Sequence, residues 1–198
     1  VLFRSKEGSE NVAIGSYSLY GNTGGNKNIA IGDHSLYINS EGTGNISIGY
    51  SAMSDNNSSS NIAIGELAMQ GSGTDITEST YNIGIGKYSL RSITNGTDNV
   101  VVGHNTMIGN TGGSYNVGLG NGVMLNSIGS YNTAIGHGVL QSEYSSSSCN
   151  VGVGCNSLFS NNGGTGNVSI GASGMYYNVN GGLNTAVGSN ALLNNSQG

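Results

Sequence analysis

The residues best suited to chemistry lie directly after a glycine that recurs along the chain. Glu66, Lys87 and His104 occupy this position in three consecutive repeats. If the repeats stack on one another, the Cα atoms of these residues lie about 5 Å apart. A carboxylate and an imidazole so placed could act as an acid–base pair with the lysine between them. The alternative, which we favour, is a solvated polar edge with one ordinary ion pair, so we expect no catalytic residue.

Histidine placement argues against a metal site. His34, His104 and His137 never fall in neighbouring repeats at one position, whereas zinc sites need three or four convergent ligands. The chain also lacks a phosphate-binding loop, a G-x-S-x-G nucleophile turn and a G-G-x-G-x-D calcium repeat. We therefore expect no metal, no cofactor and no enzymatic activity.

Tyrosine is enriched, with eleven residues against two phenylalanines. Tyr20 and Tyr37 occupy equivalent positions in adjacent repeats, and so do Tyr115 and Tyr131. Exposed ring pairs can stack on sugars, although aromatic pairs between strands also stabilise a sheet without any ligand. These four rings are candidate ligand contacts, and a purely structural ladder of rings is the alternative.

A longer fourth repeat supplies the other candidate contacts. Its loop between Gln70 and Tyr81 carries Asp75 and Glu78. Insertions in solenoids often lie on the binding face. A surface loop that is merely tolerated is the simpler interpretation.

The composition excludes several classes of protein. The 198 residues include 36 glycines and no proline, only 8% are charged, and the net charge is −5. Ordinary globular domains are about a quarter charged. Nucleic acids require a basic stripe that this chain lacks, and no apolar run approaches the roughly 20 residues of a membrane helix. We expect no nucleic-acid partner and no membrane insertion in this segment.

A five-residue motif recurs along the chain: Asn, aliphatic or Thr, small, aliphatic, Gly. Its intervals range from 16 to 21 residues and are most often 17. Identical amides stacked one turn apart can hydrogen-bond as a ladder. For Asn45 and Asn167, N-linked glycosylation is the alternative, because both lie in Asn-x-Ser sequons. The predicted ladder comprises Asn11, Asn28, Asn45, Asn61, Asn82, Asn99, Asn116, Asn132, Asn150, Asn167 and Asn184.

Each repeat carries two short apolar stripes, one in the motif and one that ends in Leu or Met four residues after the glycine. Recurrent glycine and crowded β-branched residues argue against a helix. We predict an all-β parallel β-solenoid, or β-roll, of about eleven 17-residue turns with two short strands each. Both stripes are expected to face the interior. The predicted core comprises Val12, Ile14, Leu19, Ile31, Leu36, Ile48, Met53, Ile64, Met69, Ile85, Leu90, Val102, Met107, Leu119, Met124, Ile135, Leu140, Val153, Leu158, Ile170, Met175, Val187 and Leu192.

The repeats define one predicted solenoid domain over residues 11–198, preceded by a non-repeat segment at 1–10. The first five residues, VLFRS, resemble a translated sequencing-adapter end. We expect them to be an artefact, which would make the chain a fragment of a longer one.

Two cysteines, Cys149 and Cys155, flank one first stripe. Six extended residues separate their Cα atoms by about 20 Å, which is far beyond disulfide reach. Both are therefore expected to be free thiols within the chain, and the redox compartment stays open.

The stretches NTAIGHGVL from Asn132 and NTAVGSNALL from Asn184 resemble the head repeats of YadA-type trimeric autotransporter adhesins. They also resemble the longer repeats of phage and viral tail fibres, which often precede an endosialidase-type chaperone domain. This resemblance implies a parallel β-roll, a side-by-side homotrimer, and an extracellular place on a virion tail fibre or a bacterial cell surface. The small residues between the strand aliphatics, from Ala13 to Ala186, fit it, because small side chains would let sheets approach closely about a threefold axis.

The expected function is that of a structural or adhesive fibre segment that holds a receptor-binding surface for a host receptor or glycan. The alternatives are a self-assembling extracellular filament, an ice-binding solenoid and a polysaccharide-cleaving tailspike. Ice binding calls for a threonine-rich face, whereas only Thr133 and Thr185 occur in the first apolar column. Cleavage calls for clustered carboxylates, whereas the ten acidic residues are scattered along the chain.

Overall fold

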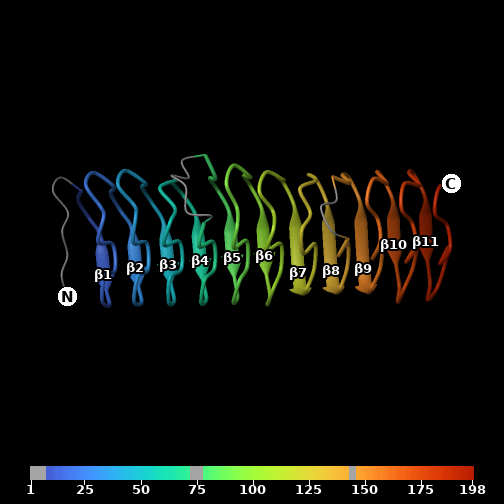
Figure 1. Cartoon of the computed structure of the whole chain (residues 1–198), viewed down its shortest axis with the longest axis horizontal. Helices are drawn as coiled ribbons and strands as arrows, with labels where there is room; N and C mark the ends of the chain where they lie inside the picture. Colours follow the sequence, from blue (N-terminus) through green and yellow to red (C-terminus); the bar gives the residue numbers. More distant parts are fainter. Residues whose placement is uncertain (1–7, 72–77, 143–145) are drawn as a thin grey trace.

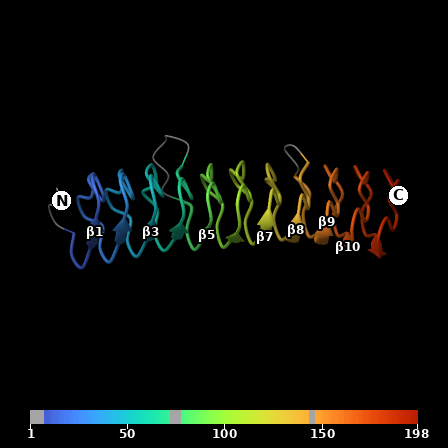
Figure 2. The same cartoon turned by 90° about the horizontal axis from the view of Figure 1, so that it is seen from below.

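The chain coils into a rod built on one parallel sheet (Figure 1). The structure is a computed structural model, and it describes residues 8–71, 78–142 and 146–198. Each strand pairs with the next in chain order, and the same order of rungs is visible after a quarter turn (Figure 2). The strands are β1 (Val12–Ile14), β2 (Ile29–Ile31), β3 (Ile46–Ile48), β4 (Ile62–Ile64), β5 (Ile83–Ile85), β6 (Val100–Val102), β7 (Val117–Asn121), β8 (Thr133–His137), β9 (Val151–Cys155), β10 (Val168–Ile170) and β11 (Thr185–Val187).

Equivalent residues of successive repeats lie directly opposite one another. Ile14 pairs with Ile31 between β1 and β2, and the register is unchanged from Ile64 to Ile85 across the longest repeat. At about 4.8 Å per strand the eleven strands span about 48 Å. The predicted all-β parallel β-solenoid is confirmed.

The prediction of two strands in each turn was wrong. Each turn has one strand in the described residues, and the second stripe forms a series of turns. Its backbone still bonds to the next turn: the Leu36 N–H donates to the Ala52 carbonyl at 2.9 Å, and the Ile38 N–H donates to the Ser54 carbonyl at 2.8 Å. The stripe is not extended because the Leu or Met in it has a positive φ.

This left-handed backbone explains which residues occupy the second stripe. Leu36 has φ of 52° and Met53 has φ of 48°, and the other members of this column lie close to these values. Left-handed geometry is most unfavourable for β-branched side chains, so Leu and Met are found here while Ile and Val fill the strands. Burial of each side chain, worth about 1.5–3 kcal/mol, offsets a conformational cost of about 1–2 kcal/mol.

The interior of the rod is filled from this column. All its members except Leu192 at the last rung are buried. Leu192 was predicted to lie in the core, but it is 47% exposed at the end of the described rod. The buried members are Leu19, Leu36, Met53, Met69, Leu90, Met107, Met124, Leu140, Leu158 and Met175.

The strand aliphatics do not belong to the core, which corrects the prediction. Within each strand the central small residue is the most buried and its two neighbours point outward. Ile14 is 55% exposed and Ile170 is 43% exposed. The outward residues that were assigned to the core are Val12, Ile14, Ile31, Ile48, Ile64, Ile85, Val102, Leu119, Ile135, Val153, Ile170 and Val187.

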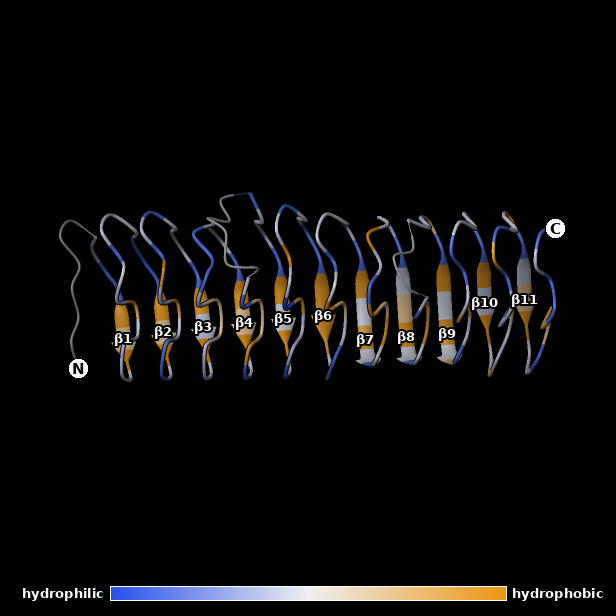
Figure 3. Cartoon of the chain, viewed as in Figure 1, coloured by the Kyte–Doolittle hydropathy of each residue, from blue (hydrophilic) through white to orange (hydrophobic). Residues whose placement is uncertain are grey.

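The thinness of the roll is the reason for this orientation. A Cβ atom on Gly84 would lie 3.1 Å from Cγ of Met69, and one on Gly118 would lie 3.1 Å from Cε of Met124. The Leu and Met side chains therefore occupy the space beneath the strands, and only small residues fit between them and the sheet. We term the segments that connect one strand to the next the return segments, and the side of the rod that they form the return side. Hydropathy colouring shows the orange band of strands against largely blue and white return segments (Figure 3).

Across residues 8–71, 78–142 and 146–198, no helix is long and apolar enough to cross a membrane.

The glycine at the end of each strand except the last lies too close to the next turn to accept a side chain, and substitution can test this packing. Gly86 has φ of 121°, and a Cβ added there would lie 2.3 Å from the carbonyl oxygen of Gly103. We expect Gly86→Ala to lower the free energy of unfolding by about 3 kcal/mol, measured by urea denaturation followed by circular dichroism. Exposed Gly112, whose nearest neighbour would be a side-chain oxygen at 3.3 Å, is the matched control. Equal losses from Gly86→Ala and Gly112→Ala would contradict the close packing of rungs.

Candidate interaction surfaces

The repeat asparagines form a continuous ladder along one edge of the sheet. The side-chain Oδ1 of each accepts a hydrogen bond from the backbone N–H of the asparagine one repeat later, at 2.9–3.0 Å in all ten steps. The internal members of the ladder are buried, and only Asn11 and Asn184 at the ends are partly exposed. Burial of Asn45 and Asn167 in the ladder favours the structural role over glycosylation at these two sequons.

The amide nitrogens of the ladder bind the corners of the rod. Asn28 Nδ2 donates to the Gly42 carbonyl at 2.8 Å, and Asn167 Nδ2 donates to the Gly181 carbonyl at 2.8 Å. Some also donate to the preceding amide, as Asn99 Nδ2 does to Asn82 Oδ1 at 2.9 Å. The ladder thus joins each turn both to its neighbour and to its own return segment.

A second series of buried asparagines was missed by sequence reasoning. Asn39 Nδ2 donates to Asn22 Oδ1 at 3.1 Å, and Asn178 Nδ2 donates to Asn161 Oδ1 at 2.8 Å. For every member except Asn56, the signal was an asparagine three residues before a glycine, as in NTGG and NNGG. The buried members are Asn22, Asn39, Asn56, Asn110, Asn161 and Asn178.

The residues that follow the strand glycines form an exposed polar row, which we term the trailing rim. Lys87 Nζ lies 2.9 Å from Glu66 Oε1, while His104 Nδ1 lies 3.3 Å from Asn121 Nδ2. The hydrogen bond that Lys87 donates to the Glu66 carboxylate raises the pKa of Lys87 above its ordinary value, so this lysine stays protonated at neutral pH and is not poised to act as a general base. The trailing rim comprises Ser16, Asp33, Tyr50, Glu66, Lys87, His104, Asn121, His137, Cys155, Ala172 and Ser189.

A second exposed row borders the other edge of the sheet, directly before the ladder asparagines, and we term it the leading rim. Most of its residues have φ near 60°, including Tyr115 and Tyr131. The rings of these two stack at 5.0 Å with planes 7° apart, and both are at least half exposed. The leading rim comprises Glu10, Lys27, Gly44, Ser60, Tyr81, Asp98, Tyr115, Tyr131, Cys149, Gly166 and Leu183.

The two rims enclose two columns of aliphatic side chains, and we term the whole surface the outer face. In the rung of β9, for example, Val151 and Val153 lie between Cys149 and Cys155. The inward-pointing residues of that rung are Asn150 and Gly152, both buried. The outer face is therefore a long apolar strip with rims that are mostly polar.

The return side of the rod carries separate aromatic clusters. Tyr20 and Tyr37 stack at 5.5 Å with planes 12° apart, and His34 lies 5.1 Å from Tyr37 and 4.9 Å from Tyr17. His34 also contacts the Asp33 carboxylate through Nδ1. The rings of this cluster belong to the segments that connect the strands, and the cluster reaches the outer face only where His34 contacts Asp33 of the trailing rim.

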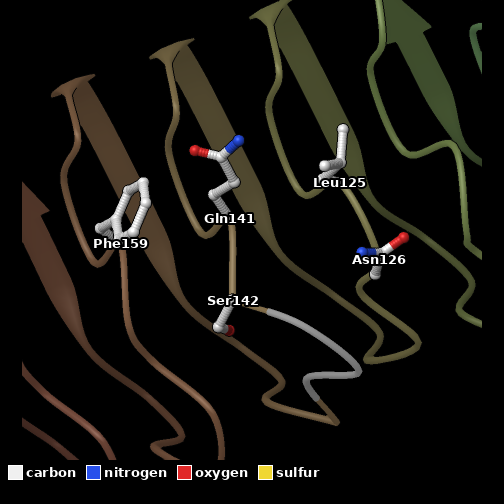
Figure 4. A pocket seen from close by; sticks show the side chains of 5 residues that line it. All are labelled: Leu125, Asn126, Gln141, Ser142 and Phe159. Carbon is white, nitrogen blue, oxygen red and sulfur yellow. The ribbon is translucent and has the colours of Figure 1, made fainter.

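A hollow of about 270 Å³ lies on the same return side, near the other end of the rod. Leu125, Gln141 and Phe159 line it from three successive returns, with Asn126 and Ser142 below them (Figure 4). Phe159 stacks on Tyr176 at 4.8 Å with planes 4° apart. These five lining residues are uncharged and combine an aromatic ring with amide and hydroxyl groups.

The other predicted site residues are not brought together. Asp75 lies outside the described residues, and Glu78 is exposed beside that gap. Among the described residues no group of three His, Cys, Asp or Glu side chains could hold a metal ion. Cys149 and Cys155 are both exposed and unbonded within the chain.

Comparison of the chain with protein-family models, with curated proteins and with solved structures finds no match.

The asparagine ladder can be tested at its centre. Asn99 Oδ1 accepts the Asn116 N–H at 3.0 Å, and Asn99→Ala would leave that buried donor unpaired. We expect the free energy of unfolding to fall by about 2 kcal/mol in urea denaturation. Exposed Asn180 is the control, and Asn180→Ala is expected to change the free energy by less than about 0.5 kcal/mol. An Asn99→Ala variant as stable as the control would refute a structural role for the ladder.

Proposed function

We propose that this chain is a stiff segment of an extracellular fibre, on a virion tail fibre or a bacterial surface. Three copies pack side by side on their outer faces and hold an attachment surface away from the particle or cell. The observation that carries this proposal is the continuous row of outward-pointing strand side chains, nearly all aliphatic and all at least partly exposed, including the exposed Val12, Ile14, Val100, Val102 and Ile170. The resemblance of the repeats to adhesin heads and tail-fibre repeats supports the same function.

The size of the outer face supports association. Eleven strands at about 4.8 Å and the five residues between the rims at about 3.4 Å give a strip of about 48 by 17 Å, or about 800 Å². Specific interfaces bury about 800 Å² on each partner, and monomeric proteins seldom expose apolar strips of this size. The mostly polar rims around an aliphatic centre also match the usual anatomy of interfaces.

The width of the face favours three copies. Stacked sheets lie about 10 Å apart, so each sheet lies about 5 Å from the plane of contact. Three sheets at about 5 Å from a common axis form a triangular prism with sides of about 17 Å. This matches the roughly 17 Å spanned by the five residues between the two rims. In this trimer the outward aliphatic columns surround the axis. The small residues from Ala13 to Ala186, which were expected to lie at the axis, face the interior of each chain instead.

Attachment is assigned to the return side, which such a trimer leaves exposed. The cluster around Tyr37 and the hollow beside Phe159 present rings together with amide, hydroxyl and carboxylate groups. Aromatic faces with polar neighbours suit contact with sugars. Three chains would present each cluster three times, so weak contacts could add to firm attachment.

Sedimentation equilibrium of the reduced chain tests the assembly. We expect a trimer at micromolar concentration, and we expect Ile135→Glu to dissociate it because a charge would be buried among three sheets. Ile38 is 49% exposed on the return side, and Ile38→Glu is expected to leave the trimer intact. A folded monomer of the unmodified chain would refute the proposal.

Binding of the trimer to an array of neutral and acidic oligosaccharides tests the attachment surface. The double variant Tyr37→Ala and Phe159→Ala is expected to reduce binding at least tenfold, since the loss of each ring removes a stacking platform. The variant Tyr37→Phe and Phe159→Tyr keeps both rings and should retain binding. Undiminished binding by the alanine variant would move the attachment surface elsewhere.

A further inference from the structure

The two cysteines lie at opposite ends of one rung of the outer face. Cys149 belongs to the leading rim and Cys155 to the trailing rim, and both are exposed. Six extended residues place their Cα atoms about 20 Å apart, so they cannot bond within the chain. At the next rung the two rims carry Gly166 and Ala172, which leave space beside each thiol.

Cyclic symmetry would bring the two rims of different copies together. When identical rods surround an axis parallel to their length, each copy presents one edge to its neighbour's other edge at the same height. The leading rim of one copy then faces the trailing rim of the next, rung by rung. Residues that are six positions apart in one chain become neighbours between chains.

The rim residues of other rungs are complementary in this arrangement. Lys27 would face Asp33, which has the opposite charge, and Asp98 would face His104, an imidazole that can donate to its carboxylate. Among the described residues the ion pairs are His34 with Asp33 and Lys87 with Glu66, so Lys27 and Asp98 have no ion-pair partner in the same chain there.

Two further features of the rims are compatible with this pairing. At the third rung Gly44 would face Tyr50, the only tyrosine of the trailing rim, which is 55% exposed. Across the eleven rungs no leading-rim residue meets a trailing-rim residue of the same charge. A second copy would give Lys27 and Asp98 the charged or polar partner that neither has in the described part of one chain.

We infer that the leading rim of each copy docks on the trailing rim of the next, and that Cys149 of one chain forms a disulfide with Cys155 of its neighbour. The inference rests on the proposed side-by-side trimer and specifies its pairing. A closed trimer would hold three such bonds in one ring around the rod at the level of β9.

The disulfide also distinguishes three copies from two. In a trimer the rims meet at the corners of the prism. In a face-to-face dimer the rims stay about 10 Å apart, the spacing of stacked sheets. That exceeds the roughly 7 Å between Cα atoms that a disulfide can bridge.

The chemistry is thiol–disulfide exchange with an external disulfide such as oxidised glutathione. The Cys149 thiolate attacks the glutathione disulfide and releases one glutathione thiolate. The Cys155 thiolate of the neighbouring chain then attacks the mixed disulfide and releases the second. Two protein thiols lose two electrons and two protons overall, and one glutathione disulfide becomes two thiols.

Oxidation of the assembled chain with glutathione disulfide, followed by non-reducing denaturing electrophoresis, tests the pairing. The unmodified chain should run at three times its mass of 20.0 kDa. Cys149→Ser and Cys155→Ser should each run as single chains, because each variant lacks one of the two cysteines that every proposed disulfide needs. An equimolar co-assembly of the two variants should yield linked pairs of chains.

Two results would overturn the inference. One is cross-linking of Cys149→Ser or Cys155→Ser alone to the extent seen with the unmodified chain, which would mean that like residues meet. The other is a reduced protein that sediments as a trimer but does not cross-link, which would leave the proposed function standing and remove the pairing. A monomeric reduced protein would remove both.

A charge exchange at the second rung gives an independent readout on the reduced protein. Lys27→Asp and Asp33→Lys each place like charges at three contacts of the trimer, and each is expected to raise the dissociation constant about tenfold. The double variant restores opposite charges and should return to within about threefold of the original value. Additive weakening in the double variant would contradict contact between these residues.

Discussion

The structure depends on the hydrogen bond between the side-chain oxygen of one repeat asparagine and the backbone N–H of the next. Strands of three to five residues offer little to hold a register. The ladder supplies it, because each bond joins one residue to its own equivalent one repeat later. Repeats of 16 and of 21 residues therefore stack with the same alignment, and variation in length is confined to the return segments.

A second constraint follows from the shape of the return segment. Left-handed Leu and Met residues turn inward and fill a cavity only one side chain deep. The inward-pointing position at the centre of each strand therefore holds only Ala, Ser, Gly or Val. The larger aliphatic residues of the strands point outward. The protein thus carries apolar side chains on both sides of its sheet, and the proposed assembly would cover the outer set. The proposed fibre and the proposed pairing of rims both rest on this one feature.

Much of this architecture could be predicted from the sequence. Periodic asparagine and glycine establish the repeat, and the Leu and Met column is recognisably apolar. Alternation shows that Ala30 and Ile31 point to opposite faces of the sheet, but it does not show which face is inside. That choice depends on the φ of Leu36, which no local pattern of hydrophobicity reveals. The separation of Cys149 and Cys155 was likewise predictable, whereas their position at the two edges of an exposed face was not.

Small-angle X-ray scattering of the reduced chain tests the central claim most directly, since it measures mass and longest dimension together. Turns stacked about 4.8 Å apart, with copies packed side by side, predict three times the 20.0 kDa chain mass in a particle still about 50 Å long. A particle whose length grows in proportion to its mass would show end-to-end stacking instead. A compact particle of single-chain mass would contradict an outer face that requires other copies.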